Sequence, residues 1–223
     1  MLSKEWLDSL MHLAIMISVC MGALSFHEYI RAVIANFLGD DTAKKLGRMT
    51  LNPVAHLDFW GTIMLLFMQV GWASSVPFNV KKFKYPRLYA VLSGAAGMFS
   101  HFILSLFSFF LLKYCYVLHW ASPVPRMLQK LFLASAEVNA MLGAFNVLPI
   151  PPLDGSNMIV AAFNRRFPSV VQWLHRYALV ILFLVLFIPT TRMMVMQGVF
   201  GVSNWIGSVF FVNYKQEIGS CFF

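Results

Sequence analysis

The stretch Ser-Phe-His-Glu-Tyr-Ile-Arg-Ala-Val-Ile-Ala, residues 25–35, lies near the end of an apolar run that begins at about Leu10. In the zinc-binding motif His-Glu-x-x-His, two histidines one helical turn apart bind one ion and the glutamate acts as general base. His27 and Glu28 match the first two positions, whereas Arg31 stands at the second histidine position. Because ionisable side chains within a membrane-length apolar run are costly, we interpret these residues as a functional site.

The composition is that of a membrane protein. Apolar residues make up 59% of the 223 residues, charged residues make up 12%, and the mean hydropathy is +0.70. The net charge of +8 lies mostly between apolar runs, as the positive-inside rule predicts, and there is no basic face on a soluble domain to bind nucleic acid. The cysteines indicate neither a disulfide framework nor a zinc knuckle. Glu5 and Asp8, with no strongly basic start, argue against a cleaved signal peptide.

The hydropathy pattern predicts an all-α, polytopic membrane protein with about five to six apolar segments, since a spanning helix needs roughly 20 apolar residues. The segments are 10–38, 59–73, 88–118, 131–148, 177–189 and 193–212. Segment 59–73 is short and contains Gly61, Gln69 and Gly71, so we expect a re-entrant or tucked helix there. We expect one integral membrane domain over residues 1–223, with a core at about 10–163 and accessory spans at about 177–212.

The loops between these segments are polar or basic. Residues 43–58 are predicted to be a polar loop with a turn at Asn52-Pro53, and residues 74–87 a basic loop whose charge favours the cytoplasmic side. A further basic loop is predicted from Pro168 and its neighbouring arginines, which are Arg165, Arg166 and Arg176.

Asp154 lies far along the chain from His27, in the Pro- and Gly-broken segment 146–155, Asn-Val-Leu-Pro-Ile-Pro-Pro-Leu-Asp-Gly. A backbone break at membrane depth is tolerated where protein covers it or where it lines a cavity, so this segment can fold back on the first helix. Two histidines plus a carboxylate, with a fourth position open to water, form a zinc site for hydrolysis. Asp154 is therefore the natural carboxylate ligand.

Together these motifs resemble the site-2 protease family of intramembrane zinc metallopeptidases, in its compact bacterial branch without a PDZ domain. The resemblance covers about residues 20–160 in a fixed order. Its motifs are His27-Glu28; residues 47–53 with His56 and Asp58; residues 71–73 leading to Val76-Pro77; a helix start containing Gly97; and residues 146–155.

The resemblance implies that His27 and Asp154 bind zinc and that Glu28 activates the metal-bound water. It also implies hydrolysis of membrane-embedded polypeptides within the bilayer, guided by a hairpin after the first core helix. The sequence departs from the family pattern in four places: Arg31 replaces the second histidine, 97–101 reads Gly-Met-Phe-Ser-His instead of Gly-Pro-x-x-Asn, Ser156 ends the Leu-Asp-Gly-Gly signature, and Ser74 replaces a lysine.

Arg31 decides between the interpretations. Its guanidinium stays charged and has no lone pair for zinc. Two unit charges about 4 Å apart interact by about 4 kcal/mol at an effective dielectric of about 20, and a dication roughly doubles this repulsion. Arg31 can instead neutralise Glu28 and Asp154, so that an ion-pair cluster replaces the metal. We therefore predict a degenerate zinc site in an inactive or impaired protease that binds membrane-embedded polypeptides.

Two alternatives stay open. An active zinc protease would use His27, Asp154 and His101 as a substitute ligand, with Arg31 turned toward the interface; otherwise His101 is a buried, hydrogen-bonded histidine. The chain can also be a structural subunit of a membrane assembly. Glu137 is a functional candidate because it is ionisable within an apolar helix, whereas His56 and Asp58 are expected to orient their loop.

The sequence and the family resemblance also predict the cellular location of the protein and its partners. We expect a multi-pass protein of the bacterial inner membrane, with its site toward the cytoplasmic side. The expected partners are membrane lipids and a membrane-embedded polypeptide, without nucleic acid, and oligomerisation stays open.

Overall fold

The computed structural model describes residues 4–59, 61, 63, 74–118, 123–151, 153–156, 160 and 167–211. The predicted all-α fold is confirmed. The α-helices are α1 (Lys4–Phe37), α2 (Thr42–Lys45), α4 (Pro86–Val117), α5 (Pro123–Asn146), α7 (Pro168–Arg176), α8 (Ala178–Phe187) and α9 (Pro189–Phe210), and two short 3-10 turns are η1 (Pro53–His56) and η2 (Val80–Lys82).

Three described helices, α1, α4 and α9, are long and apolar enough to cross a membrane. The pair α7 and α8, bent by 62°, passes the same test when taken together, which gives up to four spans in the described part of the chain. By length and composition this is a multi-pass membrane protein, as predicted. Most of the expected short segment 59–73 lies outside the described residues.

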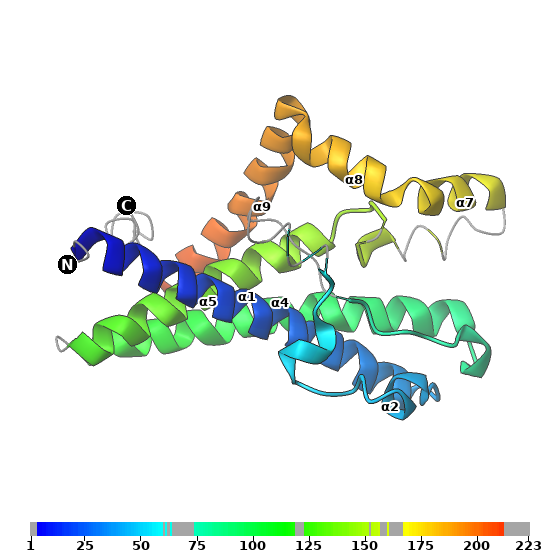
Figure 1. Ribbon diagram of the computed structural model, residues 1–223, viewed down its shortest axis with the longest axis horizontal. Coiled ribbons are helices and arrows are strands. Elements are labelled where there is room, and N and C mark those ends of the chain that lie inside the picture. Colours follow the sequence, from blue (N-terminus) through cyan, green and yellow to red (C-terminus); the bar gives the residue numbers. More distant parts are fainter. Residues whose placement is uncertain are drawn as a thin grey trace.

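Helices α1, α4 and α5 form a bundle that positions the site (Figure 1). Ser93 Oγ of α4 donates a hydrogen bond to the carbonyl of Arg31, and His101 of α4 bonds to Asn139 of α5, both at 3.0 Å. Residue numbers along contacting helices run in opposite directions, so α4 is antiparallel to both of its neighbours. The ends of α1 and α5 that carry the motif residues therefore meet beside the first half of α4.

Helix α9 closes the bundle from a different side. Phe109 and Leu112 of α4 pack with Leu133 of α5 and Ile206 of α9 in the largest buried apolar cluster among the described residues. In Figure 1, α7 and α8 lie along the upper edge, and α9 slopes from them back toward the bundle. The accessory helices therefore join the core mainly through α9.

One predicted loop is wrong. Residues Pro168–Arg176 form helix α7, with Pro168 at its first turn. Proline is favoured there because its missing N–H would have no helical partner and its fixed φ suits a helix. Val171 is buried, whereas Trp173 is exposed. The prediction failed because arginines and a proline are typical of a loop, although here they belong to or flank an amphipathic helix. Arg165 and Arg166 lie outside the described residues.

Candidate active site

Helix α1 supplies three ionisable side chains to one buried position. His27, Glu28 and Arg31 are 5%, 3% and 7% exposed, respectively. Arg31 Nη1 donates to Glu28 Oε1 at 3.0 Å, one helical turn away. His27 Nε2 lies 3.7 Å from the same carboxylate oxygen. The helix therefore brings together an imidazole, a carboxylate and a permanent cation.

Asp154 joins this group from the Pro- and Gly-broken segment, as the sequence predicted. Its Oδ2 lies 3.0 Å from His27 Nε2, and its Oδ1 lies 3.6 Å from Arg31 Nε. Gly155 packs tightly next to this carboxylate: a Cβ on that residue would clash with the carbonyl oxygen of Val147. We call His27, Glu28, Arg31 and Asp154 the ion cluster.

The chain after residue 73 closes one side of the ion cluster. The backbone N–H of Val76 donates to Glu28 Oε2 at 2.7 Å, and Val76 is 2% exposed. The ring of Phe78 lies over the guanidinium of Arg31, 5.0 Å from its carbon to the ring centroid. Both oxygens of Glu28 are therefore engaged, and Arg31 is held by an aromatic face as well as by carboxylates.

Gly97 of α4 makes room for the ion cluster. A Cβ on Gly97 would lie 2.6 Å from Arg31 Cγ and 2.9 Å from His27 Cε1, closer than real Cβ contacts allow. The absence of a side chain at Gly97 lets α4 approach the face of α1 that carries the site.

His101 lies against the ion cluster without reaching Arg31's position. Its ring stacks on that of His27, with centroids 4.8 Å apart and planes 25° apart, and its Nδ1 hydrogen-bonds to Asn139 Oδ1 at 3.0 Å. His101 Nε2 and His27 Nδ1 are buried and have no hydrogen-bond partner in the described part of the structure. His101 is thus the buried, hydrogen-bonded histidine that one interpretation expected, with an amide as its partner.

His56 and Asp58 of the polar loop bond within that loop and not to the ion cluster. His56 Nε2 hydrogen-bonds to the carbonyl of Thr50 at 2.8 Å, and Asp58 Oδ1 accepts from the N–H of Gly61 at 2.8 Å. The expectation that His56 and Asp58 orient their loop is confirmed. Glu137 is half-buried on α5.

Some site residues could not be found from the sequence. Val76 and Phe78 reach the site only because the chain after residue 73 folds back across α1. Asn139 is a polar residue in an apolar helix, which is a signal, but its partner His101 depends on the packing of two helices. Residues 71–73, which belong to the family motif, lie outside the described residues.

The potential metal donors are few. Among the described residues, no three histidine, cysteine, aspartate or glutamate side chains are arranged to hold a metal ion. In the described part of the chain, His27 Nε2 and Asp154 Oδ2 are the closest such pair at the site, 3.0 Å apart.

Comparison with known proteins places this chain in a family. No family model and no solved structure matches the chain. It is 39% identical over 168 residues to "Putative zinc metalloprotease YwhC" of Bacillus subtilis (strain 168), which covers 74% of this chain and 76% of that protein. At this identity and coverage, the chain belongs to the same family, membrane proteins of the site-2 protease type.

Proposed function

We propose that this chain is a site-2 protease-type membrane protein in which the ion cluster replaces the zinc, and that it binds membrane-embedded polypeptides without hydrolysing them. The observation that carries the proposal is the position of Arg31, whose guanidinium contacts Glu28 at 3.0 Å and Asp154 at 3.6 Å.

The donor set supports this proposal because it does not fit zinc. A catalytic zinc takes three protein ligands at about 2.0–2.2 Å and one water in a tetrahedron, so two of its donors lie about 3.3 Å apart. His27 Nε2 and Asp154 Oδ2, 3.0 Å apart, supply two such donors. The third position on α1 is Arg31, which offers a fixed charge and no lone pair.

The state of Glu28 also supports the proposal. A general base needs an oxygen free to take a proton from water. Here Oε1 accepts from Arg31 and Oε2 accepts from the backbone N–H of Val76. In this arrangement Glu28 stabilises a buried cation and fixes a backbone segment. Removing either partner of such a pair would leave an uncompensated charge in the bundle.

The alternative of an active zinc protease rests on His101, whose Nε2 is buried and unpartnered. Its ring stacks on that of His27, with the two planes only 25° apart, which is a packing contact between the rings. Its other nitrogen is bonded to Asn139. Arg31 would also have to leave a site in which it is only 7% exposed.

Metal content of the purified full-length protein tests the proposal. The wild type and Arg31→His are compared by elemental analysis, with Arg87→His as control, because Arg87 is exposed at the start of α4. We expect far less than one zinc per chain in the wild type and in the control, and a gain toward one in Arg31→His. This gain should disappear when His27→Ala is added. Stoichiometric zinc in the wild type would overturn the proposal.

A further inference from the structure

The end of the bundle where α1 ends and α4 begins carries an excess of positive charge. Residues 38–51 and 74–88 contain seven lysines and arginines but two carboxylates, Asp40 and Asp41. Lys82 donates hydrogen bonds to Asp41 and to Thr42, which joins the two stretches. We call the seven cations the basic end; they are Lys44, Lys45, Arg48, Lys81, Lys82, Lys84 and Arg87.

The two carboxylates do not neutralise the basic end. Asp41 pairs with Lys45 and Lys82, and Asp40, which is 1% exposed, lies 3.8 Å from Lys82. In the described part of the chain, the other exposed cations of the basic end pair with no carboxylate; these are Lys44, Lys81, Lys84 and Arg87. Four exposed cations are therefore available to an anion outside the chain.

Arg87 stands where the helix itself disfavours a cation. It lies in the first turn of α4, which contains no acidic residue. The amino-terminal end of a helix carries a partial positive charge, so a cation there is repelled and an anion is attracted. The position of Arg87 therefore does not stabilise α4, and it indicates a partner with negative charge.

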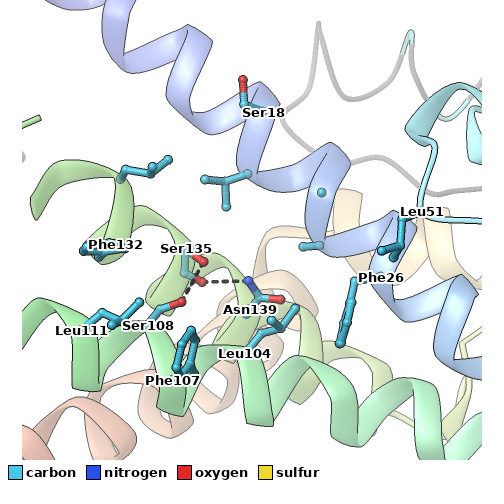
Figure 2. A pocket seen from close by; sticks show the side chains of 14 residues that line it. Ser18, Phe26, Leu51, Leu104, Phe107, Ser108, Leu111, Phe132, Ser135 and Asn139 are labelled. Atoms are coloured by element: carbon cyan, nitrogen blue, oxygen red, sulfur yellow. Dashed lines mark hydrogen bonds between the residues drawn. The ribbon is translucent and has the colours of Figure 1, made fainter. Parts of the chain in front are cut away.

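The position of the basic end along the bundle places it at the level of lipid headgroups. Exposed apolar side chains recur along α4 from Leu88 to Phe110, and Figure 2 shows one of them, Phe107, at the apolar groove between α1 and α4. At 1.5 Å per residue this belt is about 33 Å long, close to the roughly 30 Å of a hydrocarbon core. Arg87 comes directly before the belt, and Lys113 follows it at the other end.

Large apolar side chains are exposed among these cations. Phe37 is 85% exposed, Leu46 is 62% exposed and Tyr85 is 54% exposed. At a bilayer interface such side chains insert between headgroups and acyl chains, while lysine and arginine attract anionic headgroups. A soluble acidic polypeptide matches the charge alone, whereas an anionic bilayer matches both the charge and the exposed apolar groups.

We propose that the basic end binds the phosphate headgroups of anionic lipids, such as phosphatidylglycerol, in the leaflet that it faces. It selects these lipids over zwitterionic ones because each uncompensated cation near the membrane surface attracts negative charge. Lys81 belongs to the chain segment after residue 73 that closes the ion cluster, so a lipid bound there contacts this segment as well as the start of α4. The inference does not depend on whether the ion cluster binds zinc.

Thermal unfolding of the full-length protein tests the inference, in micelles of a non-ionic detergent and phosphatidylcholine to which phosphatidylglycerol is added. The wild type is compared with the double variant Lys81→Gln/Arg87→Gln, which removes two charges and keeps two long polar side chains. The phosphatidylglycerol fraction at half-maximal stabilisation measures the relative affinity. We expect this fraction to rise about tenfold in the double variant, equivalent to about 1.4 kcal/mol for the two charges together.

The matched control is Lys113→Gln/Arg126→Gln, which removes one lysine and one arginine, both exposed, from the opposite end of the bundle. It should respond to phosphatidylglycerol as the wild type does. In phosphatidylcholine alone, both double variants should unfold at the wild-type temperature. High salt should weaken the response of the wild type, because exposed charges are screened.

Three results would overturn the inference. The first is stabilisation of the wild type by phosphatidylglycerol that is no greater than by added phosphatidylcholine. The second is an equal loss of response in the two double variants. The third is equal stabilisation by polyglutamate at the same concentration of charge, which would identify a soluble acidic polypeptide as the partner. The test uses no metal, so it can fail while the wild type proves zinc-free, and it can succeed while zinc is found.

Discussion

At the scale of single residues, Arg31 makes contacts that a histidine could not. It bridges two carboxylates and lies under the ring of Phe78. Each contact depends on a charged planar group at the end of a long stem, which is the chemistry of arginine. The surroundings of Arg31 therefore suit its side chain: Gly97 leaves room for it, and the ring of Phe78 covers its guanidinium.

Gly97 gives the first prediction at this scale. We expect Gly97→Ala to lower the free energy of unfolding by about 1–3 kcal/mol, because the new methyl group overpacks against Arg31 and His27. Reversible unfolding in mixed micelles measures the change. The matched control is Gly22→Ala on α1, where a Cβ meets nothing within 4 Å.

At Gly22 the alanine should be neutral or stabilising by up to about 1 kcal/mol, the helix-propensity difference between the two residues. Equal effects of the two substitutions would show that α4 does not approach the ion cluster as closely as the 2.6 Å contact requires.

The residue types in the sequence predicted which ionisable side chains form the site, but not the backbone and ring contacts around them. His27, Glu28, Arg31 and Asp154 were expected to meet because charges in apolar segments must find partners, and they do. The N–H of Val76 could not be predicted, since a backbone group carries no sequence signal. Nor could the stacking of His101 on His27, which depends on the relative rotation of two helices.

At the scale of elements, the chain that follows residue 73 is fixed to the end of α1 at several points. Asp40 is 1% exposed and accepts hydrogen bonds from the N–H groups of Thr42 and Asn79, at 3.0 and 2.6 Å. Arg48 donates to the carbonyl of Ser74. Gly39, with φ of +107°, allows the sharp turn after α1 that presents Asp40. These bonds hold Val76 over Glu28.

Asp40 gives a prediction of pH dependence. Burial alone would raise its pKa, yet hydrogen bonds from Thr42 and Asn79 and the charge of Lys82 bring the pKa below the ordinary value of 3.8. A carboxylate with a lowered folded-state pKa stabilises the fold above its unfolded pKa, and this contribution is lost as the pH falls below it. We expect hydrogen exchange in residues 74–83, corrected for intrinsic rates, to rise as the pH falls from about 6 to about 3.

Asp40→Asn should show the faster exchange at both pH values, because the amide keeps neither the charge nor both acceptors. Asp41→Asn is the control: the pKa of Asp41 is lowered to about 2 by hydrogen bonds from Lys45 and Lys82, whose side chains are exposed, so this carboxylate contacts residues 74–83 through a solvent-exposed ammonium and not through a buried backbone N–H. Exchange in Asp40→Asn as slow as in the wild type would contradict the role of Asp40 in holding residues 74–83.

The helix boundaries were predicted most accurately where an apolar run ended at residues that favour a turn. Helix α4 was predicted at 88–118 and spans Pro86–Val117, and α1 was predicted to end one residue beyond Phe37. The predicted apolar segments begin later in the sequence than helices α1 and α5 do, because both helices include polar residues before the apolar run. Helix α7 was missed for the same reason: hydropathy alone does not detect an amphipathic helix of nine residues.

At the scale of the whole molecule, cations gather at one end of the bundle. This end comprises the loop after α1 and the start of α4, which meet because the two helices are antiparallel. Its cations are Lys44, Lys45, Arg48, Lys81, Lys82, Lys84 and Arg87. At 1.5 Å per residue, His27 lies about 15 Å along α1 from this end, near the middle of a typical hydrocarbon layer.

This charge distribution predicts the orientation of the site. By the positive-inside rule the cation-rich end faces the cytoplasm. In a variant without native cysteines, Lys84→Cys should react with a membrane-impermeant maleimide only from the cytoplasmic side, and Arg126→Cys near the start of α5 only from the other side, since both native residues are exposed. Labelling of intact cells and of inverted vesicles distinguishes the two. The reverse pattern would place the loop over Glu28 outside the cell and would contradict this orientation.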